Sequence, residues 1–409
     1  MVVRSQPKLE VVRARISLAT MLDEAHRLTV AARADVPPFH VMDVMSAAAR
    51  RQRLHGDVVS FAAGQPSSQA PSLVIEAAQR ALREHPLGYT EQLGILELRT
   101  ALAGHYGRQY DLDVSPDDLV LTTGSSGAFL LGFLAAFDPG DRVALARPGY
   151  PAYRNILRAL GCEVVELPCG PETRFQPTVE MLKEIGPIQG LIVASPANPT
   201  GTVLDAAELA ALSAWCVEHG VQLVSDEIYH GISYGRPLRC AWETSREAIV
   251  VNSFSKAFAM TGWRLGWMLV PERLHRAVDR LTGNFTLCPP ALAQYAAVKA
   301  FEPESYAEMA VEVDRYRANR DLLLEGLHAL GIDKVAPADG AFYAYADIKH
   351  LTDDSMAFCR KLLDDTGVAI VPGIDFDPVH GHEFVRFSFA GATADIEEGL
   401  RRLGSWLGK

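Results

Sequence analysis

Paired cysteines are missing from this chain of 409 residues. Its six cysteines are scattered, and none forms a CxxC pair, which argues against zinc-ribbon and thioredoxin-like chemistry. Isolated thiols in a large chain are typical of a reducing cytosol, where they serve as small buried hydrophobic side chains. We therefore expect a cytoplasmic protein without a metal site.

Long apolar runs and an excess of positive charge are missing as well. The longest apolar stretch, Ala128–Phe137, contains a glycine and is far shorter than the ~20 residues that cross a bilayer. The N-terminal segment carries charges throughout, so we expect no secretory signal. The net charge of −11 disfavours nucleic acid and anionic membranes as partners.

What the chain does contain is a regular alternation of short apolar runs and helical patterns. Nearly uninterrupted apolar runs are typical of strands covered on both faces. Asp205–His219 has helical spacing, with Asp205 as the expected cap and Gly220 as the expected stop. This alternation predicts an α/β domain built on a largely parallel sheet. The expected strands are Val58–Phe61, Leu119–Thr122, Arg142–Ala146, Glu163–Leu167, Gly190–Ala194, Val221–Ser225, Ile249–Ser253 and Leu265–Val270.

The same patterns predict four parts of the chain. Residues 1–34 form an N-terminal extension, and 35–69 form an arm that contributes to a smaller domain. Residues 70–302 form the large domain, and 303–409 form a smaller α+β domain. In the smaller domain we expect strands at Ala341–Asp347, Ala369–Val371 and Phe384–Phe389, and helices at Glu304–Leu330, Ser355–Asp365 and Ala394–Leu407.

Two segments place reactive side chains at strand ends. VSDEIY puts Asp226 and Tyr229 just after one apolar run, and SFSKAFAMTGWR carries Ser253, Lys256 and Arg264. Ligands of open α/β sheets bind at the carboxyl ends of the strands. A lysine in apolar surroundings has a lowered pKa and becomes nucleophilic, as a Schiff-base lysine requires. Taken singly, a solvated lysine and a structural arginine explain the pattern as well.

Two further segments are turns that follow expected strands. TTGSSGAF (Thr122–Phe129) joins a strand to a helix, whose N-terminal N–H groups attract phosphate. SPANPTG (Ser195–Gly201) is a rigid turn that presents Asn198, and an X–Pro bond in such a turn can be cis. Each segment alone also fits an ordinary connection.

Together the motifs resemble a known family. The order GQP, GYT, GSSGA, PGY, SPANPTG, SDEIY, SFSK and RFSFA is similar to that of class I/II aminotransferases of fold type I, which use pyridoxal 5′-phosphate. The match runs from about Phe39 to Leu407. Within this family the sequence resembles bacterial aspartate and valine–pyruvate aminotransferases. It implies a seven-stranded, mostly parallel sheet sandwiched by helices, a smaller α+β domain, and a homodimer. The expected partners are an amino acid and a 2-oxo acid.

The resemblance implies roles around the cofactor ring. Lys256 forms the Schiff base with the cofactor and moves the proton, and Asp226 keeps the pyridine nitrogen protonated. Asn198 and Tyr229 hydrogen-bond the phenolic oxygen of the ring. Tyr150 stacks on the ring, although PGYPAY also fits a turn with two packed tyrosines.

The resemblance also implies two anion sites. Arg386 binds the substrate α-carboxylate together with Gly64 and Asn198, a task that suits the forked guanidinium group. The alternative for Arg386 is a strand residue that faces solvent. The residues implied for the cofactor phosphate are Ser125, Ser126, Ser253, Arg264, and Tyr89 from the neighbouring subunit.

The expected donor is a neutral or aliphatic amino acid. Aspartate-specific relatives hold the distal carboxylate with a lysine where this chain has Ser126, or with an arginine of the partner subunit where it has Gly283–Thr286; the nearest arginine here is Arg280. An unpaired carboxylate is costly to bury. The segment Phe39–Met42 aligns with the wall of the side-chain pocket and is mostly apolar. Valine–pyruvate or alanine aminotransferase chemistry is therefore favoured, with aspartate aminotransferase as the alternative.

Other functions of the same fold stay open at this point. β-C–S lyases and aminocyclopropane-carboxylate synthases use the same lysine and differ only in the fate of the carbanion. A transcription regulator would need a basic DNA-binding module, and the roughly 34 residues before the main fold are too few for one.

Overall fold

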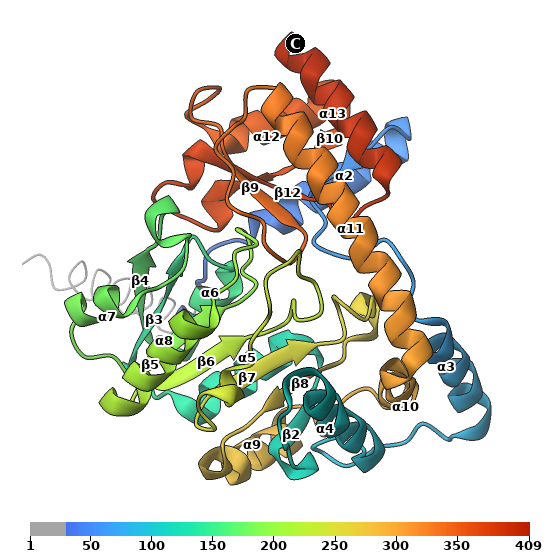
Figure 1. The fold of residues 1–409 in the computed structure, drawn as a ribbon, viewed down its shortest axis with the longest axis vertical. Coiled ribbons are helices and arrows are strands. Elements are labelled where there is room, and N and C mark those ends of the chain that lie inside the picture. Colours follow the sequence, from blue (N-terminus) through green and yellow to red (C-terminus); the bar gives the residue numbers. More distant parts are fainter. Residues whose placement is uncertain (1–29) are drawn as a thin grey trace, which may run out of the picture. The chain divides into compact units, whose positions relative to one another are not determined.

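The apolar strands of the large lobe form one sheet that is buried on both faces. The side chain of Val250 packs into one hydrophobic core, and those of Ile249 and Val251 pack into another. Because successive strand residues point to opposite faces, a continuous apolar run needs cover on both sides. Figure 1 shows this sheet and its covering helices in the computed structural model, which describes residues 30–409.

The strand order confirms the predicted fold class. Seven strands lie in the order β2-β8-β7-β6-β5-β3-β4. All neighbours are parallel except β8, which runs antiparallel to both β2 and β7. No α-helix connects β7 to β8, and a parallel pair needs a crossover connection. The strands are β2 (Leu119–Thr122), β3 (Arg142–Arg147), β4 (Glu163–Pro168), β5 (Gly190–Ala194), β6 (Gln222–Asp226), β7 (Ile249–Ser253) and β8 (Gly266–Leu269).

Two sets of helices cover the two faces of the sheet. One core contains residues of α5 (Gly124–Ala136), α6 (Pro151–Leu160) and α9 (Glu272–Phe285). The other contains residues of α4 (Leu96–Tyr110) and α8 (Ala206–His219). The Asp205 carboxylate accepts hydrogen bonds from the first turn of α8, and Gly220 ends the helix with φ of 65°, as the sequence predicts. The remaining helices of this lobe are α3 (Ser72–Glu84), α7 (Val179–Glu184) and α10 (Ala291–Ala297).

The smaller lobe is built on short, mostly antiparallel strands. β9 (Tyr343–Asp347), β12 (Phe384–Ser388) and β11 (Val371–Pro372) form an antiparallel sheet. The strand expected at Ala369–Val371 is divided. β10 (Val368–Ala369) pairs with β1 (Val59–Ser60), whereas β11 pairs with β12.

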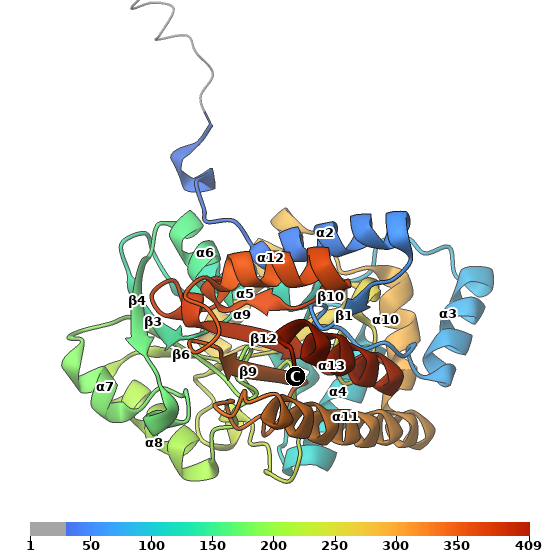
Figure 2. The same ribbon diagram turned by 90° about the horizontal axis from the view of Figure 1, so that it is seen from above.

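Long helices surround these strands. Figure 2 shows α11 (Pro303–Ala329), α12 (Ser355–Thr366) and α13 (Thr393–Leu407) around β9 and β12. α11 contacts α3 of the large lobe and α13 of the smaller one. α2 (His40–His55), which the sequence patterns do not identify, lies against β11.

Of the predicted N-terminal extension, residues 1–29 lie outside the described part of the chain. Residues 30–36 contain one turn of 3-10 helix at Ala32–Ala34, and residues 37–409 form a separate compact unit.

Candidate functional site

A cavity of ≈ 490 Å³ gathers nearly all the predicted site residues. It opens where β6 and β7 end, and the first turn of α5 and the middle of β12 border it. The predicted residues that line it are Gly64, Ser125, Ser126, Tyr150, Asn198, Asp226, Tyr229, Lys256, Arg264 and Arg386. Side chains from both lobes therefore converge on one space.

Asp226 is a buried carboxylate at the end of β6. It accepts hydrogen bonds from the Tyr153 hydroxyl and from the Ile228 N–H, the latter at 3.0 Å. Burial raises the pKa of Asp226 to about 6, against the lowering effect of these two hydrogen bonds. A cationic or N–H donor in the cavity would offset the cost of burying this charge.

Lys256 is a partly buried side chain whose amine faces the same cavity. Its Nζ donates to the Gly64 carbonyl oxygen at 2.6 Å and lies 5.6 Å from the centre of the Tyr229 ring. Burial, and after it the nearby Arg386 charge, lower the pKa of Lys256 to about 8. Compared with an exposed lysine, a larger fraction of this amine is neutral and nucleophilic near neutral pH.

Arg386 comes from β12 and is only 2% exposed, so the alternative of a solvent-facing strand residue is wrong. Nη1 donates to the Asn198 Oδ1 at 3.0 Å, and Nη2 donates to the Ala62 carbonyl oxygen at 2.9 Å. The guanidinium lies over the rings of Tyr343 and Phe376, at 4.4 and 4.9 Å. Nε is buried without a hydrogen-bond partner among residues 30–409, and an anionic ligand would supply acceptors for this group.

The SPANPTG turn carries Asn198 to Arg386. The Ser195–Pro196 and Asn198–Pro199 bonds are both cis. The Ser195 hydroxyl accepts a hydrogen bond from the Leu204 N–H at 3.0 Å, which closes the loop between β5 and α8.

The other end of the cavity is suited to a phosphate. Ser125 and Ser126 lie in the first turn of α5, where backbone N–H groups lack helical partners. The Arg264 guanidinium lies beside this turn: a Cβ atom added to Gly124 would lie only 2.5 Å from Nη2 of Arg264. Arg264 has a φ of 54° and donates to the Thr261 carbonyl oxygen at 3.0 Å. Hydroxyls, free N–H groups and a cation thus converge on one spot.

Two predicted residues do not line the cavity. The Ser253 hydroxyl is directed to the Leu265 carbonyl oxygen at 3.2 Å and to Ser255 at 2.9 Å, and it is Ser255 that reaches the cavity. Tyr89 is 86% exposed and does not border the cavity in the single chain.

Sequence reasoning missed several contributors. The Tyr153 hydroxyl donates a hydrogen bond to Asp226. Tyr150 and Tyr153 are three residues apart at the start of α6, and this helical spacing could have indicated that both face the same site. Tyr343 lines the cavity between Tyr229 and Arg386, and no local pattern identifies it.

Asp375 is a third missed residue. Its carboxylate accepts hydrogen bonds from the His40 and Val41 N–H groups, at 3.0 and 2.7 Å, and so caps α2 from more than 300 residues away. The predicted wall residues Phe39, Val41 and Met42 line the cavity. The apolar wall is therefore held by the smaller lobe.

Within residues 30–409, no helix is both long and apolar enough to cross a bilayer. The same residues contain no group of three or more His, Cys, Asp or Glu side chains arranged to hold a metal ion.

Known proteins share both this sequence and this fold. The sequence pattern of the aminotransferase class I and II family matches residues 56–403. A valine–pyruvate aminotransferase of Mycobacterium tuberculosis is 64% identical over 381 residues, which cover 92% of this chain and 98% of that protein. An aspartate/prephenate aminotransferase of Thermus thermophilus is 39% identical and covers 88% of this chain and 93% of its own length.

A solved structure agrees with these matches. The crystal structure of an aminotransferase from Mycobacterium tuberculosis superimposes with a TM-score of 0.92 at 63% identity, covering 93% of this chain and all of that one. The matched region includes every residue of the cavity described above from Gly64 to Arg386. The chain belongs to the class I and II aminotransferases.

Proposed function

We propose that this aminotransferase uses pyridoxal 5′-phosphate to move an amino group from a neutral, aliphatic L-amino acid such as valine to pyruvate or another 2-oxo acid. The observation that carries the proposal is the convergence of Lys256, Asp226 and Arg386 on one cavity. The valine–pyruvate relative supports the choice of donor. We also propose a cytoplasmic location, which the six free cysteines support, since five of them are buried.

The residues of the cavity fit the proposed cofactor. The first turn of α5 and Arg264 suit its phosphate, and the Tyr229 and Asn198 side chains can reach its phenolic oxygen. Asp226, buried and short of a cationic partner, suits a protonated pyridine nitrogen. When bound, the protonated ring would delocalise the electron pair that proton removal leaves on the substrate Cα.

Each side chain then has a task in the reaction. Arg386 binds the substrate α-carboxylate through the forked guanidinium, which orients Cα toward Lys256. The neutral Lys256 amine would take the proton from the substrate Cα and hold it for the return transfer. With the cofactor bound, Asp226 would keep the pyridine nitrogen protonated, and Tyr229 would donate a hydrogen bond to the phenolic oxygen. The two half-reactions share these residues, so ping-pong kinetics are expected.

The cavity favours donors without a second carboxylate. Among the described residues, the cationic side chains that line it are Lys256, Arg264 and Arg386, and each has a task above. Ser126 occupies the position of the distal-carboxylate lysine, and neither Arg280 nor His40 borders the cavity. Phe39, Val41 and Met42 add an apolar wall.

We expect valine or alanine to exceed aspartate as donor. A missing charge-assisted contact costs about 1.5–3 kcal/mol, or one to two decades in kcat/KM. The measurement is kcat/KM for a panel of donors at saturating pyruvate and again at saturating 2-oxoglutarate. If aspartate were the best donor by tenfold or more, aspartate aminotransferase chemistry would replace the proposal.

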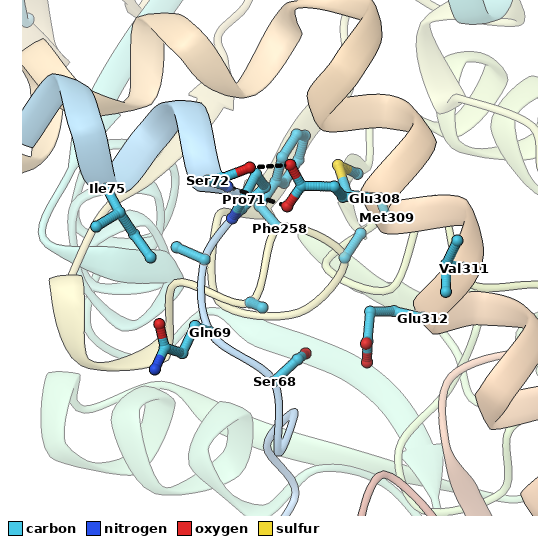
Figure 3. Close-up of a pocket in the computed structure, with 13 residues that line it drawn as sticks. Ser68, Gln69, Pro71, Ser72, Ile75, Phe258, Glu308, Met309, Val311 and Glu312 are labelled. Atoms are coloured by element: carbon cyan, nitrogen blue, oxygen red, sulfur yellow. Dashed lines mark hydrogen bonds between the residues drawn. The ribbon is translucent and has the colours of Figure 1, made fainter.

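We further propose that the active unit is a homodimer. A groove, which we call the outer groove, runs along Ser68–Ala70 and Ile75 beside Ala259 and has two parts of ≈ 410 and ≈ 730 Å³. Figure 3 shows its first part, where the Ser72 N–H and hydroxyl bond to the Glu308 carboxylate. Thr261 borders both the outer groove and the site cavity. In the proposed dimer, the exposed Tyr89 of the second copy reaches the phosphate end of the cavity through this groove.

A mixing experiment tests the shared site. Lys256→Ala chains should be almost inactive and Tyr89→Ala chains weakly active, and unfolding and refolding the two together should restore activity. Half of the random dimers are hybrids with one intact site of two, so roughly a quarter of wild-type activity is expected. Sedimentation of the same samples should show dimers. No recovery on mixing, or a fully active monomer, would contradict the proposal.

A further inference from the structure

Tyr343 touches three functional groups of the cavity at once. Its hydroxyl lies 2.7 Å from the Tyr229 hydroxyl, and its ring lies under the Arg386 guanidinium at 4.4 Å. A side chain on Gly64 would come within 2.2 Å of the Tyr343 hydroxyl, and the Gly64 carbonyl oxygen accepts from Lys256. Tyr343 is 1% exposed, so its hydroxyl has little access to solvent.

The contact between the two tyrosines raises a question of proton direction. Each phenol has one O–H to donate and can also accept. Tyr229 can donate to the phenolic oxygen of the cofactor only if it accepts the hydrogen bond from Tyr343. If Tyr343 were the acceptor, the single Tyr229 proton would be directed away from the cofactor.

Arg386 makes Tyr343 the better donor. A guanidinium beside a phenol stabilises negative charge on its oxygen, and the more acidic of two phenols donates. Burial raises the pKa of both hydroxyls, but the Arg386 charge and the hydrogen bond shared with Tyr229 lower the pKa of Tyr343. For Tyr229, burial raises the pKa most and the neighbouring Tyr343 raises it further; Arg386 lowers it as well, but by less than Tyr343 raises it.

We propose that Tyr343 is a positioning residue that donates its hydroxyl proton to Tyr229 and thereby commits the Tyr229 proton to the phenolic oxygen of the cofactor. The proposal rests on the function proposed above. A hydroxyl that accepts one hydrogen bond is polarised and donates more strongly. Tyr343 therefore strengthens the hydrogen bond from Tyr229 to the phenolic oxygen, and the acidity of the Lys256 nitrogen linked to the cofactor depends on that bond.

The test is a pH titration of the visible absorbance of the holoenzyme. Weaker donation to the phenolic oxygen leaves that oxygen more basic, so the proton it shares with the Lys256 nitrogen is held to higher pH. Tyr229→Phe removes the donor altogether, so its upward shift of the titration midpoint is the largest that loss of this hydrogen bond can cause. Tyr343→Phe should shift it upward by less, roughly 0.1–0.7 pH units, since a polarising neighbour adds about 10–30% to a hydrogen bond made to a charged oxygen.

Two further variants sharpen the result. The double variant Tyr229→Phe/Tyr343→Phe should titrate like Tyr229→Phe alone, because Tyr343 acts through Tyr229. Tyr345→Phe is the matched control: Tyr345 lies on the same strand, is equally buried, and its hydroxyl has no hydrogen-bond partner within residues 30–409. Its midpoint should not move. Since the phenylalanine ring stays under Arg386, KM for the donor should change less than twofold in Tyr343→Phe.

The direction of the shift decides the outcome. A downward shift would identify Tyr343 as the acceptor, and no shift would leave it a packing residue; either result overturns the proposal, as would a shift in the double variant well beyond that of Tyr229→Phe. A wild-type protein that gains no visible band from pyridoxal phosphate would instead contradict the proposed function itself.

Discussion

Lys256→Ala is expected to bind pyridoxal phosphate without the visible band of the wild type and to lose transamination by a factor of about 10⁴ or more. In the proposed mechanism the amine supplies both the covalent link to the cofactor and the proton transfer at Cα, and general acid–base catalysis alone is worth about 10²–10⁴. Some cofactor should remain bound, because Arg264, Ser125 and Ser126 are unchanged. The absorbance spectrum and the rate of a single half-reaction with valine are the measurements.

Lys349→Ala is a suitable control for this variant. Lys349 is two-thirds exposed and bonds to Glu383 on the surface, so its removal should leave both the spectrum and the rate unchanged. Added small primary amines should partly restore proton transfer in Lys256→Ala, since the cavity left by the side chain can hold an external base. Near-native transamination by Lys256→Ala would rule out the role proposed for this lysine.

Asp226→Asn should have the second largest effect, a loss of about 10²–10³ in the rate of the half-reaction. A neutral amide cannot hold the ring nitrogen protonated, and removing one preorganised charge from a buried site costs about that much. KM for the donor should change little, because Arg386 and Asn198, and not Asp226, are the residues proposed to bind the carboxylate. Single-turnover rates with valine separate the proton-transfer step from binding.

The neighbouring residue offers a matched control. Glu227 is also a buried carboxyl, but it does not line the cavity; it accepts from Ser225 and from the Ala241 N–H. Burial raises the pKa of Glu227 to about 8, so it is largely protonated at pH 7 and glutamine imitates that form. Glu227→Gln should therefore retain most activity. Equal losses in both variants would mean that any change in this buried pair disturbs the fold, and an unchanged rate in Asp226→Asn would exclude its proposed role.

Much of the large lobe follows from the sequence by local rules. Strands at Leu119–Thr122, Gly190–Ala194 and Ile249–Ser253 have the predicted bounds, because short apolar runs between turn signals need cover on both faces wherever they occur. The cap at Asp205 and the stop at Gly220 are equally local, since each acts on a backbone group within four residues. The motifs at strand ends needed only the rule that ligands bind at the carboxyl edge of such a sheet.

What the sequence alone could not determine depends on partners far along the chain. The side on which Arg386 lies was open until β12 was placed between β9 and β11, and only then does its guanidinium meet Asn198, 188 residues away. The break of Ala369–Val371 into two strands is decided by their different pairing partners, β1 and β12.

The positions of Tyr343 and Asp375 have the same origin. Tyr343 meets Tyr229 across 114 residues, and Asp375 caps α2 across 334. Periodicity and turn chemistry describe how a segment folds against its own neighbours. By contrast, Tyr343 meets Tyr229 where the two lobes border one cavity, and Asp375 meets α2 within the smaller lobe. The sequence by itself therefore determined the strands, the turns and the reactive residues at their ends, and the tertiary structure decided which distant side chains hold those residues in place.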